Sequence, residues 1–239
     1  PLKACDPYLR YVFLTGITKF SQLSIFSELN NIENISMDEP YAAICGISED
    51  EIRSQMKEDV EGLAKKLEVT PEEALMKLKE NYDGYHFTYP SPDIYNPFSL
   101  LTAMEKGKIG SYWFGSGTPT YLIKMLDKFG VVPSEIGKKK AAVEDFDAPT
   151  ERMTSIIPLL YQSGYITIKD YDEELDLYTL DIPNKEVRIG LMKSLLPYYV
   201  ASKAPETNTM VAYLSRDIRN GDIDAALRRL QMFHHTSVR

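Results

Sequence analysis

A continuous apolar run near the start of the chain, Tyr11–Leu14, is the sequence feature that most constrains the fold. It stops at Thr15-Gly16, where glycine permits a sharp change of direction. A short apolar run without polar alternation is typical of a strand buried on both faces of a parallel sheet. We find no convincing parallel neighbours for it downstream. The pattern therefore predicts that Arg10–Thr15 is a central strand whose sheet lies upstream of residue 1, so that this sequence does not hold a complete activity.

Three polar residues, Thr15, Thr18 and Lys19, follow the predicted strand. In open α/β sheets, residues just past the carboxyl end of a strand face the ligand crevice, which makes these three candidate binding residues. The alternative is that Thr15 only ends the strand and that Lys19 is solvated. Spacing alone leaves both interpretations open.

Composition limits the class of function. The formal net charge of −8 over 239 residues argues against broad non-specific binding to nucleic acid or anionic membranes, although not against a local basic patch. The two cysteines, Cys5 and Cys45, lack metal-ligand spacing and favour a reduced, cytoplasmic location. No apolar run is long enough to span a bilayer, and no secretory signal is visible.

Two capping boxes, Ser48–Glu51 and Thr70–Glu73, predict consecutive helices. Apolar residues follow each box at helical spacing, and Pro71 suits a first helical position. The acidic residues Glu49–Glu51 suit the positive end of a helix dipole. We interpret them as capping rather than as a metal site, because hard cations need convergent carboxylates.

The next segment, Tyr82–Phe87, contains the turn-forming pair Asp83-Gly84. Residues 85–88 and 93–95 are predicted to pair as a small hairpin, after which Asn96 begins another helix. His86 could act as a general base, but it has no partner nearby in sequence, so a packed or surface histidine is the favoured interpretation.

A glycine-containing stretch precedes the next predicted helix. Thr118 suits its N-cap and Pro119 its first position. Gly115-Ser-Gly117 could cradle phosphate, but a linker into a capped helix is favoured, because the P-loop pattern G-x-x-x-x-G-K-[ST] occurs nowhere in the chain. Residues 130–150 are predicted to be a loop and an internal boundary. Lys138–Lys140 within them could touch phosphate, although a solvated loop is favoured.

The segment after residue 150 predicts a helix, a hairpin and a second helix capped by Asn184, an order that resembles a winged-helix module. Its wing carries five acidic residues between 170 and 176, whereas a wing that binds DNA is usually basic. A structural or intramolecular wing is therefore favoured. Two final helices, joined at Asn220–Asp222, predict a helical hairpin.

Six short motifs, in the same order and over most of the chain, resemble the bacterial AAA-ATPase-like family, which is related to the STAND P-loop ATPases. The motifs are Tyr11–Ser21, Ser27–Asn30, Cys45–Ser48, Tyr82–Phe87, Tyr95–Ser99 and Leu160–Tyr165. In that family the ATPase domain is commonly joined to a C-terminal PD-(D/E)XK nuclease-like domain.

The resemblance assigns roles to the candidate residues. The apolar run would be the sensor-1 strand, and Thr15 would face the γ-phosphate as a catalytic residue. Thr18 and Lys19 would contribute to the nucleotide site. Thr118 and Pro119 would belong to a Gly-x-Pro motif whose proline packs near the adenine.

The resemblance also implies what this chain needs from elsewhere. The phosphate-binding loop and the acidic strand that holds magnesium would lie upstream, and the nuclease-like domain downstream. Phosphoryl transfer depends on the upstream parts, so ATP and Mg²⁺ would bind the intact parent protein and not this chain tightly.

The predicted fold is mostly α with small β elements. Residues 1–47 would be the distal end of the ATPase core, 48–149 a helical lid, and 150–239 a winged-helix-like domain with C-terminal helices. The predicted function is a part of an ATPase that is not catalytic alone. The alternative is a non-catalytic winged-helix or helical interaction module, for which a basic face on the helix after Asn184 would favour DNA binding.

Overall fold

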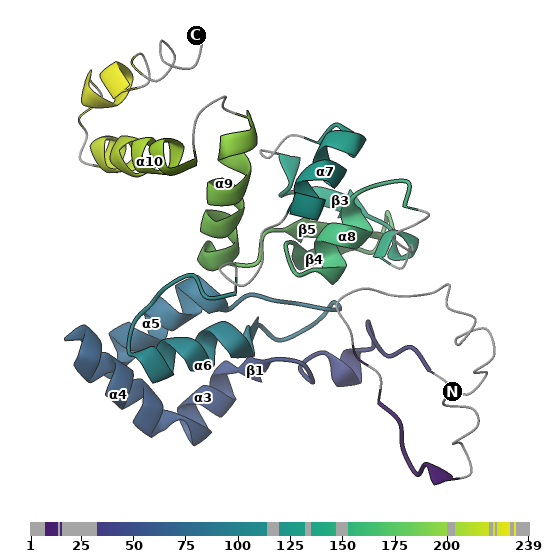
Figure 1. The fold of residues 1–239 in the computed structure, drawn as a ribbon. Coiled ribbons are helices and arrows are strands. Elements are labelled where there is room, and N and C mark those ends of the chain that lie inside the picture. Colours follow the sequence, from purple (N-terminus) through teal and green to yellow (C-terminus); the bar gives the residue numbers. More distant parts are fainter. Residues whose placement is uncertain are drawn as a thin grey trace. The chain divides into compact units, whose positions relative to one another are not determined.

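The computed structural model describes residues 8–13, 15, 33–113, 120–131, 135–146, 153–199, 204–219, 222, 224–229 and 232. These residues are mostly helical and include two small antiparallel sheets (Figure 1), which confirms the predicted class. The chain divides into two compact units, Pro1–Arg188 and Ile189–Arg239. None of the helices in these ranges is both long and apolar enough to cross a lipid bilayer.

The first unit contains a helical region that begins at the two predicted capping boxes. It is made of α3 (Glu49–Gln55), α4 (Lys57–Leu67), α5 (Pro71–Tyr82) and α6 (Pro97–Lys106). Ser48 and Thr70 each accept a hydrogen bond from the backbone N–H three residues on, and Glu51 and Glu73 accept one in return. Both capping boxes and the Asn96 cap of α6 are thus confirmed.

The periodic segment after Ser48 forms two helices rather than one. Met56 leaves the helical conformation, with φ −118° and ψ 24°, and so ends α3 and precedes α4. The bend lets both helices bury an apolar side, because Ile52 of α3 and Leu63 of α4 are each fully buried. They share one hydrophobic core with α5 and α6, made of Ile52, Val60, Leu63, Ala64, Ala74, Leu75, Leu78, Tyr82, Tyr95, Leu100, Ala103 and Met104.

A two-stranded sheet lies beside these helices. Its strands, β1 (Ile47–Ser48) and β2 (Ile94–Tyr95), pair antiparallel. Tyr85 forms an isolated antiparallel bridge to Ile94, with N···O distances of 3.2 and 3.3 Å. The predicted hairpin around residues 89–92 is therefore formed, but its pairing is limited to the single bridge between Tyr85 and Ile94.

A second sheet of three strands has the order β3-β5-β4, from β3 (Lys139–Ala141), β4 (Thr167–Asp172) and β5 (Leu177–Asp181). The prediction of a loop throughout 130–150 is wrong at β3 and at the 3₁₀ helix η5 (Val143–Phe146). The hydrogen bonds that form β3 come from its pairing with β5, which is distant in sequence, so the residues around β3 do not predict a strand. Its lysines suit an edge strand, where charge discourages further pairing.

Three further helices are α7 (Thr120–Phe129), α8 (Ile157–Gln162) and α9 (Lys185–Tyr199), of which α9 runs from the first unit into the second. The chain order α8, β4, β5, α9 agrees with the predicted order of helix, hairpin and helix. Asn184 accepts the backbone N–H of Val187 at 3.1 Å, as predicted for the α9 cap. Gly164, with φ +74°, follows α8 and supplies the left-handed conformation that ends it.

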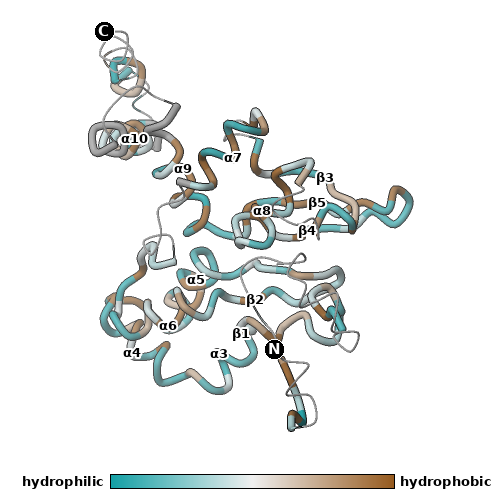
Figure 2. Tube along the Cα trace, turned by 45° about the vertical axis from the view of Figure 1, so that its right-hand side comes forward, coloured by the Kyte–Doolittle hydropathy of each residue, from teal (hydrophilic) through white to brown (hydrophobic). Residues whose placement is uncertain are grey.

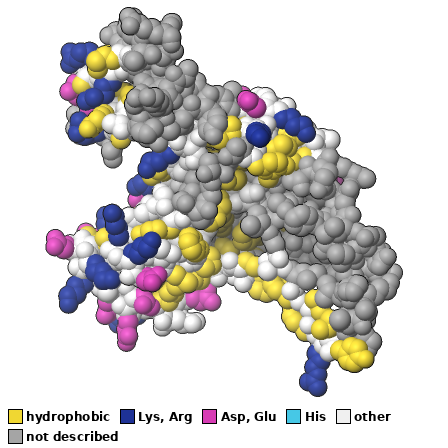
Figure 3. All heavy atoms as spheres, in the orientation of Figure 1, with side chains coloured by type: hydrophobic (Ala, Val, Ile, Leu, Met, Phe, Trp, Pro, Cys, Tyr) yellow, Lys and Arg dark blue, Asp and Glu magenta, His cyan; other side chains and the backbone are white. Residues whose placement is uncertain are grey.

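The predicted buried strand at Arg10–Thr15 is not formed. Residues 11–13 and 15 have no strand conformation, and Tyr11, Val12 and Phe13 are 77%, 42% and 43% exposed. Figure 2 draws this apolar segment in brown near the N-terminus, and Figure 3 shows hydrophobic side chains on its surface. A strand obtains its hydrogen bonds and its burial from neighbours, and none of the described residues pairs with this segment.

The second unit contains α10 (Ala204–Arg219) and a shorter helical stretch at 224–229. The Asp222 side chain accepts the backbone N–H of Ala225 at 3.0 Å and so caps the second stretch. Arg229 on this stretch forms an ion pair with Asp217 of α10 and lies over the ring of Tyr213. These contacts confirm the predicted helical hairpin.

Candidate functional site

Of the five residues predicted to contact a nucleotide, the structure describes Thr15 alone. Thr15 is exposed and is in neither a helix nor a strand. Thr18, Lys19, Thr118 and Pro119 lie outside the described residues. Their predicted roles therefore stay predictions.

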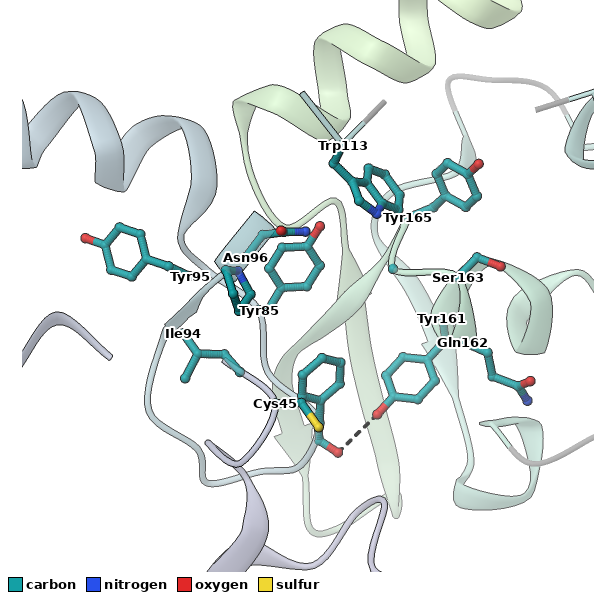
Figure 4. A pocket seen from close by; sticks show the side chains of 13 residues that line it. Cys45, Tyr85, Ile94, Tyr95, Asn96, Trp113, Tyr161, Gln162, Ser163 and Tyr165 are labelled. Atoms are coloured by element: carbon teal, nitrogen blue, oxygen red, sulfur yellow. Dashed lines mark hydrogen bonds between the residues drawn. The ribbon is translucent and has the colours of Figure 1, made fainter. Parts of the chain in front are cut away.

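The structure instead brings together four of the six resembling motifs. A cleft of about 570 Å³ is lined by residues from Cys45–Ser48, Tyr82–Phe87, Tyr95–Ser99 and Leu160–Tyr165 (Figure 4). The lining residues of these stretches lie up to 120 positions apart in the sequence, and they meet within the first unit. The full lining is Cys45, Tyr85, Phe87, Ile94, Tyr95, Asn96, Pro97, Trp113, Tyr161, Gln162, Ser163, Gly164 and Tyr165.

The segment Gly84–Phe87 forms one wall of the cleft because it is bound on two sides. Tyr85 pairs with Ile94 of β2, as described above. On the other side the backbone N–H of His86 donates to the Thr167 hydroxyl at 2.7 Å, and that hydroxyl donates to the His86 carbonyl at 2.6 Å. The Lys169 ammonium donates to the Gly84 carbonyl at 2.6 Å. This segment therefore joins the helical region to the β4–β5 hairpin.

His86 is a packed histidine, as the favoured interpretation held. Its Nδ1 lies 2.8 Å from the Ile168 carbonyl oxygen, and its Nε2 lies 2.8 Å from Asp93 Oδ1. Asp93 lies seven positions after His86, so the residues adjacent to His86 in sequence do not reveal this partner. Both ring nitrogens are engaged, which leaves neither available as a general base in this arrangement.

Aromatic rings dominate the cleft. Trp113 and Tyr165 meet edge to face with ring centroids 5.3 Å apart, and the rings of Tyr85 and Phe87 lie 6.4 Å apart. Tyr161 donates its hydroxyl hydrogen to the Phe87 carbonyl at 3.0 Å, the dashed line in Figure 4. Together with Tyr95, these rings come from four separate stretches of chain and line one space.

Gly164 sets the spacing between two of these rings. A Cβ at this position would lie 3.6 Å from the Tyr85 ring and 3.7 Å from the Trp113 ring. The turn after α8 therefore approaches both side chains closely without a side chain of its own, and positive φ favours glycine there.

A buried carboxylate supports the wall that carries the tryptophan. Glu186, in the first turn of α9, is 2% exposed and accepts the backbone N–H groups of Tyr112 and Trp113, the second at 2.9 Å. Among the described residues it has no ion-pair partner. Burial raises the pKa of Tyr85, and the negative charge of Glu186 acts in the same direction, so the Tyr85 hydroxyl stays neutral.

Other charged groups lie outside the cleft. Burial raises the pKa of the Asp83 carboxyl, whose Oδ1 lacks a hydrogen-bond partner among the described residues. Burial lowers the pKa of Lys169, which points at the carbonyl of Gly84. None of the thirteen described residues that line the cleft carries a charge. The lining is therefore formed by aromatic, apolar and uncharged polar side chains.

No group of three or more histidine, cysteine, aspartate or glutamate residues within the described ranges is placed to hold a metal ion. The acidic residues Glu49–Glu51 have other contacts. Glu49 pairs with Arg53 and Lys79, and Glu51 caps α3.

Sequence reasoning missed three residues of the site. Trp113, Tyr165 and Glu186 were not candidates, because none belongs to a pattern with a known chemical role. A usable signal existed for the first two, since each aromatic residue stands within two positions of a glycine in the sequence. Glu186 gave no local signal, because its partners lie more than 70 positions earlier.

Among curated proteins, the chain is similar to the "Uncharacterized protein in vnfD 5'region" of Azotobacter chroococcum mcd 1. The two are 31% identical over 208 residues, which is 85% of this chain and 37% of that relative. The chain thus spans well under half the length of the relative it matches. No protein-family model matches the chain, and no solved structure does.

Proposed function

We propose that this chain contributes the sensor strand, the helical lid and the winged-helix-like part to an AAA- or STAND-like ATPase, and that it is not catalytic alone. ATP and Mg²⁺ would bind where a P-loop core joins the residues around Thr15. Nucleotide state would then move the lid and the wing. The chain would be completed by this core and by a nuclease-like domain.

The observation that carries the proposal is the exposure of Tyr11, Val12 and Phe13. An apolar run typical of a parallel strand is solvent-exposed here, which is the state expected of a core strand whose neighbours are elsewhere. The greater length of the Azotobacter relative supports the same view, because it leaves room for further domains.

The acidic wing supports an intramolecular role over DNA binding. The β4–β5 turn carries Glu173, Glu174 and Asp176, all exposed. Lys185 at the start of α9 is already paired with Glu80 at 2.8 Å. Phosphate backbones favour clusters of basic side chains, and this hairpin presents the opposite charge.

The first test is ATP turnover. The 239-residue chain, incubated with ATP and Mg²⁺, should release no phosphate above a buffer blank. Turnover well above that blank would sink the proposal, because the chain would then hold a catalytic site of its own.

A second test uses the apolar run. In a polypeptide that includes the upstream region, Phe13→Asp should abolish ATP turnover, since a charge would enter the sheet. In the chain alone the same change should leave the melting temperature unaltered. Leu101→Asp, at an exposed position of α6, is the matched control and should spare turnover.

The alternative remains a non-catalytic interaction module. Two exposed cationic side chains on α9, Arg188 and Lys193, could contact the phosphates of a nucleic acid. A gel shift at physiological salt decides between them, because a shift that weakens steeply with salt would favour this alternative over the ATPase part.

A further inference from the structure

The aromatic cleft has a chemistry that the proposed ATPase role does not use. Its rings are those of Tyr85, Phe87, Tyr95, Trp113, Tyr161 and Tyr165. An aromatic face carries negative charge density and therefore attracts cations. The volume of about 570 Å³ lies in the range of small-molecule sites.

The surrounding charge favours the same kind of ligand. Glu186 lies directly behind the Trp113 backbone, is almost fully buried, and has no cationic partner among the described residues. The lining includes no lysine or arginine that could hold an anion. The amides of Tyr112 and Trp113, which could also serve an anion, are already bound to Glu186.

The positive charge of Lys169, near the cleft, does not argue against a cationic ligand. Lys169 is directed to the carbonyl oxygens of Gly84 and Pro183, and the negative charges of Asp93, Asp181 and Asp83 act on it, although Asp83 also pairs with Lys79 at 3.6 Å. The charged groups close to the cleft are therefore negative on balance.

We propose that the cleft binds an organic cation, an alkylammonium or guanidinium group, over the faces of its aromatic rings. Glu186 would add long-range attraction without direct contact. The site needs no nucleotide and no upstream domain, so it can be tested on the chain as it stands.

The chain contains one tryptophan, and it lines the cleft, so its fluorescence reports on occupancy. Choline is titrated against 3,3-dimethyl-1-butanol, its uncharged carbon isostere, at constant ionic strength. A second arm compares Nα-acetylarginine amide with the neutral Nα-acetylcitrulline amide. We expect a saturable change with at least one cation, and at least about fivefold weaker binding of its neutral isostere.

The two arms distinguish the source of the cation. Preference for choline would identify a small quaternary ammonium ligand, and preference for the arginine derivative a side chain presented by a peptide. Equal binding of a cation and its isostere would overturn the proposal. So would the lack of saturation with either cation, or tighter binding of adenosine than of both.

Two variants test the named contacts. Glu186→Gln keeps an acceptor for the two amides but removes the charge, and should weaken cation binding roughly threefold or more. Glu72→Gln, which removes an exposed charge on α5 outside the cleft, is the matched control and should not change it. Unchanged cation affinity in Glu186→Gln would contradict the proposal that the charge of Glu186 attracts the ligand.

Tyr165→Leu removes a ring but keeps an apolar side chain. It should weaken cation binding more than binding of the neutral isostere, whereas equal weakening of both would contradict a role for the ring face. Circular dichroism and the melting temperature of each variant confirm that it is folded. Failure of these tests leaves the ATPase proposal untouched, since the ATP assays do not involve the cleft.

Discussion

The helical region α3–α6 and the aromatic cleft differ in how their parts are brought together. Each helix from α4 to α6 begins no more than 26 positions after the start of the helix before it, and three of the four helices α3–α6 begin at a side-chain cap. The cleft combines residues from Cys45 to Tyr165, and its supporting carboxylate is at Glu186. The helical core is closed and apolar, whereas the cleft is open and lined by rings.

This difference shows that whether a side chain is buried depends on the segments that pack around it, and not on its hydrophobicity alone. Ile94 and Tyr95 form a strand of two residues and are each 1% exposed, because β1, Tyr85 and the helical core surround them. Tyr11–Phe13 is at least as apolar and stays exposed. The predictions below test the contrast, from the largest expected effect to the smallest.

Leu78→Ala should have the largest effect. Leu78 is fully buried in the core of α3–α6, and loss of such a side chain costs about 2–5 kcal/mol of unfolding free energy. Leu101→Ala on α6, where the side chain is half exposed, should cost far less. Urea denaturation measures both, and similar costs would show that the helical core is not closed.

Gly164→Ala should destabilise the chain by about 1–2 kcal/mol, because alanine is strained at positive φ. The new methyl group would also sit in contact with the Tyr85 and Trp113 rings and narrow the cleft. Thermal unfolding measures the first effect and the Trp113 fluorescence spectrum the second. Gly62→Ala is the control, because that position is helical with no atom near the new Cβ. A spectrum identical to wild type would contradict the packing of Gly164 against Trp113.

Thr70→Ala should cost about 1 kcal/mol by removing the cap of α5. Ser91→Ala is a matched loop control, since Ser91 only bonds its neighbouring carbonyl. Chemical denaturation gives both values. A cost no larger than that of the control would mean that packing, and not the capping box, fixes the start of α5.

Asp83→Asn should change the pH dependence of stability. Burial raises the folded-state pKa of Asp83 above its ordinary value of 3.8, so the folded state resists ionisation. Wild-type stability should therefore fall as pH rises from about that value through the raised pKa, and the variant should lack this loss. Parallel pH profiles of the melting temperature would contradict a strained carboxylate at this position.

Phe13→Ser should have the smallest effect, within about 0.5 kcal/mol, because an exposed side chain contributes little to the stability of this chain. The melting temperature checks it. A large loss would mean that the apolar run is packed against the rest of the chain in solution, and the contrast with Ile94 would fail.

The sequence predicts those parts of the fold that depend on adjacent residues. The caps at Ser48, Thr70, Asn96 and Asn184 are local hydrogen bonds, so residue type and spacing suffice to find them. The sequence does not predict β3, because a lysine-rich strand is recognised only by its pairing with β5. The strand predicted at Arg10–Thr15 is not formed for the complementary reason, since its pattern is strand-like but no described residue pairs with it.

The candidate site was predictable only in part. The resembling motifs contain most of the residues that line the cleft, although they gave no hint that these stretches meet. Their convergence depends on contacts such as that between His86 and Thr167, 81 positions apart. Long-range contacts of this kind follow from the completed fold and not from any local period.

The double anchoring of Gly84–Phe87 has a consequence for how the first unit loses its structure. The helical region cannot separate from the β4–β5 hairpin without breaking one of two sets of bonds, those of Tyr85 to Ile94 or those of His86 and Gly84 to Thr167 and Lys169. The two regions should therefore melt in one cooperative transition. In native-state hydrogen exchange, the Tyr85 and His86 amides should report the opening of this whole unit and not a local fluctuation.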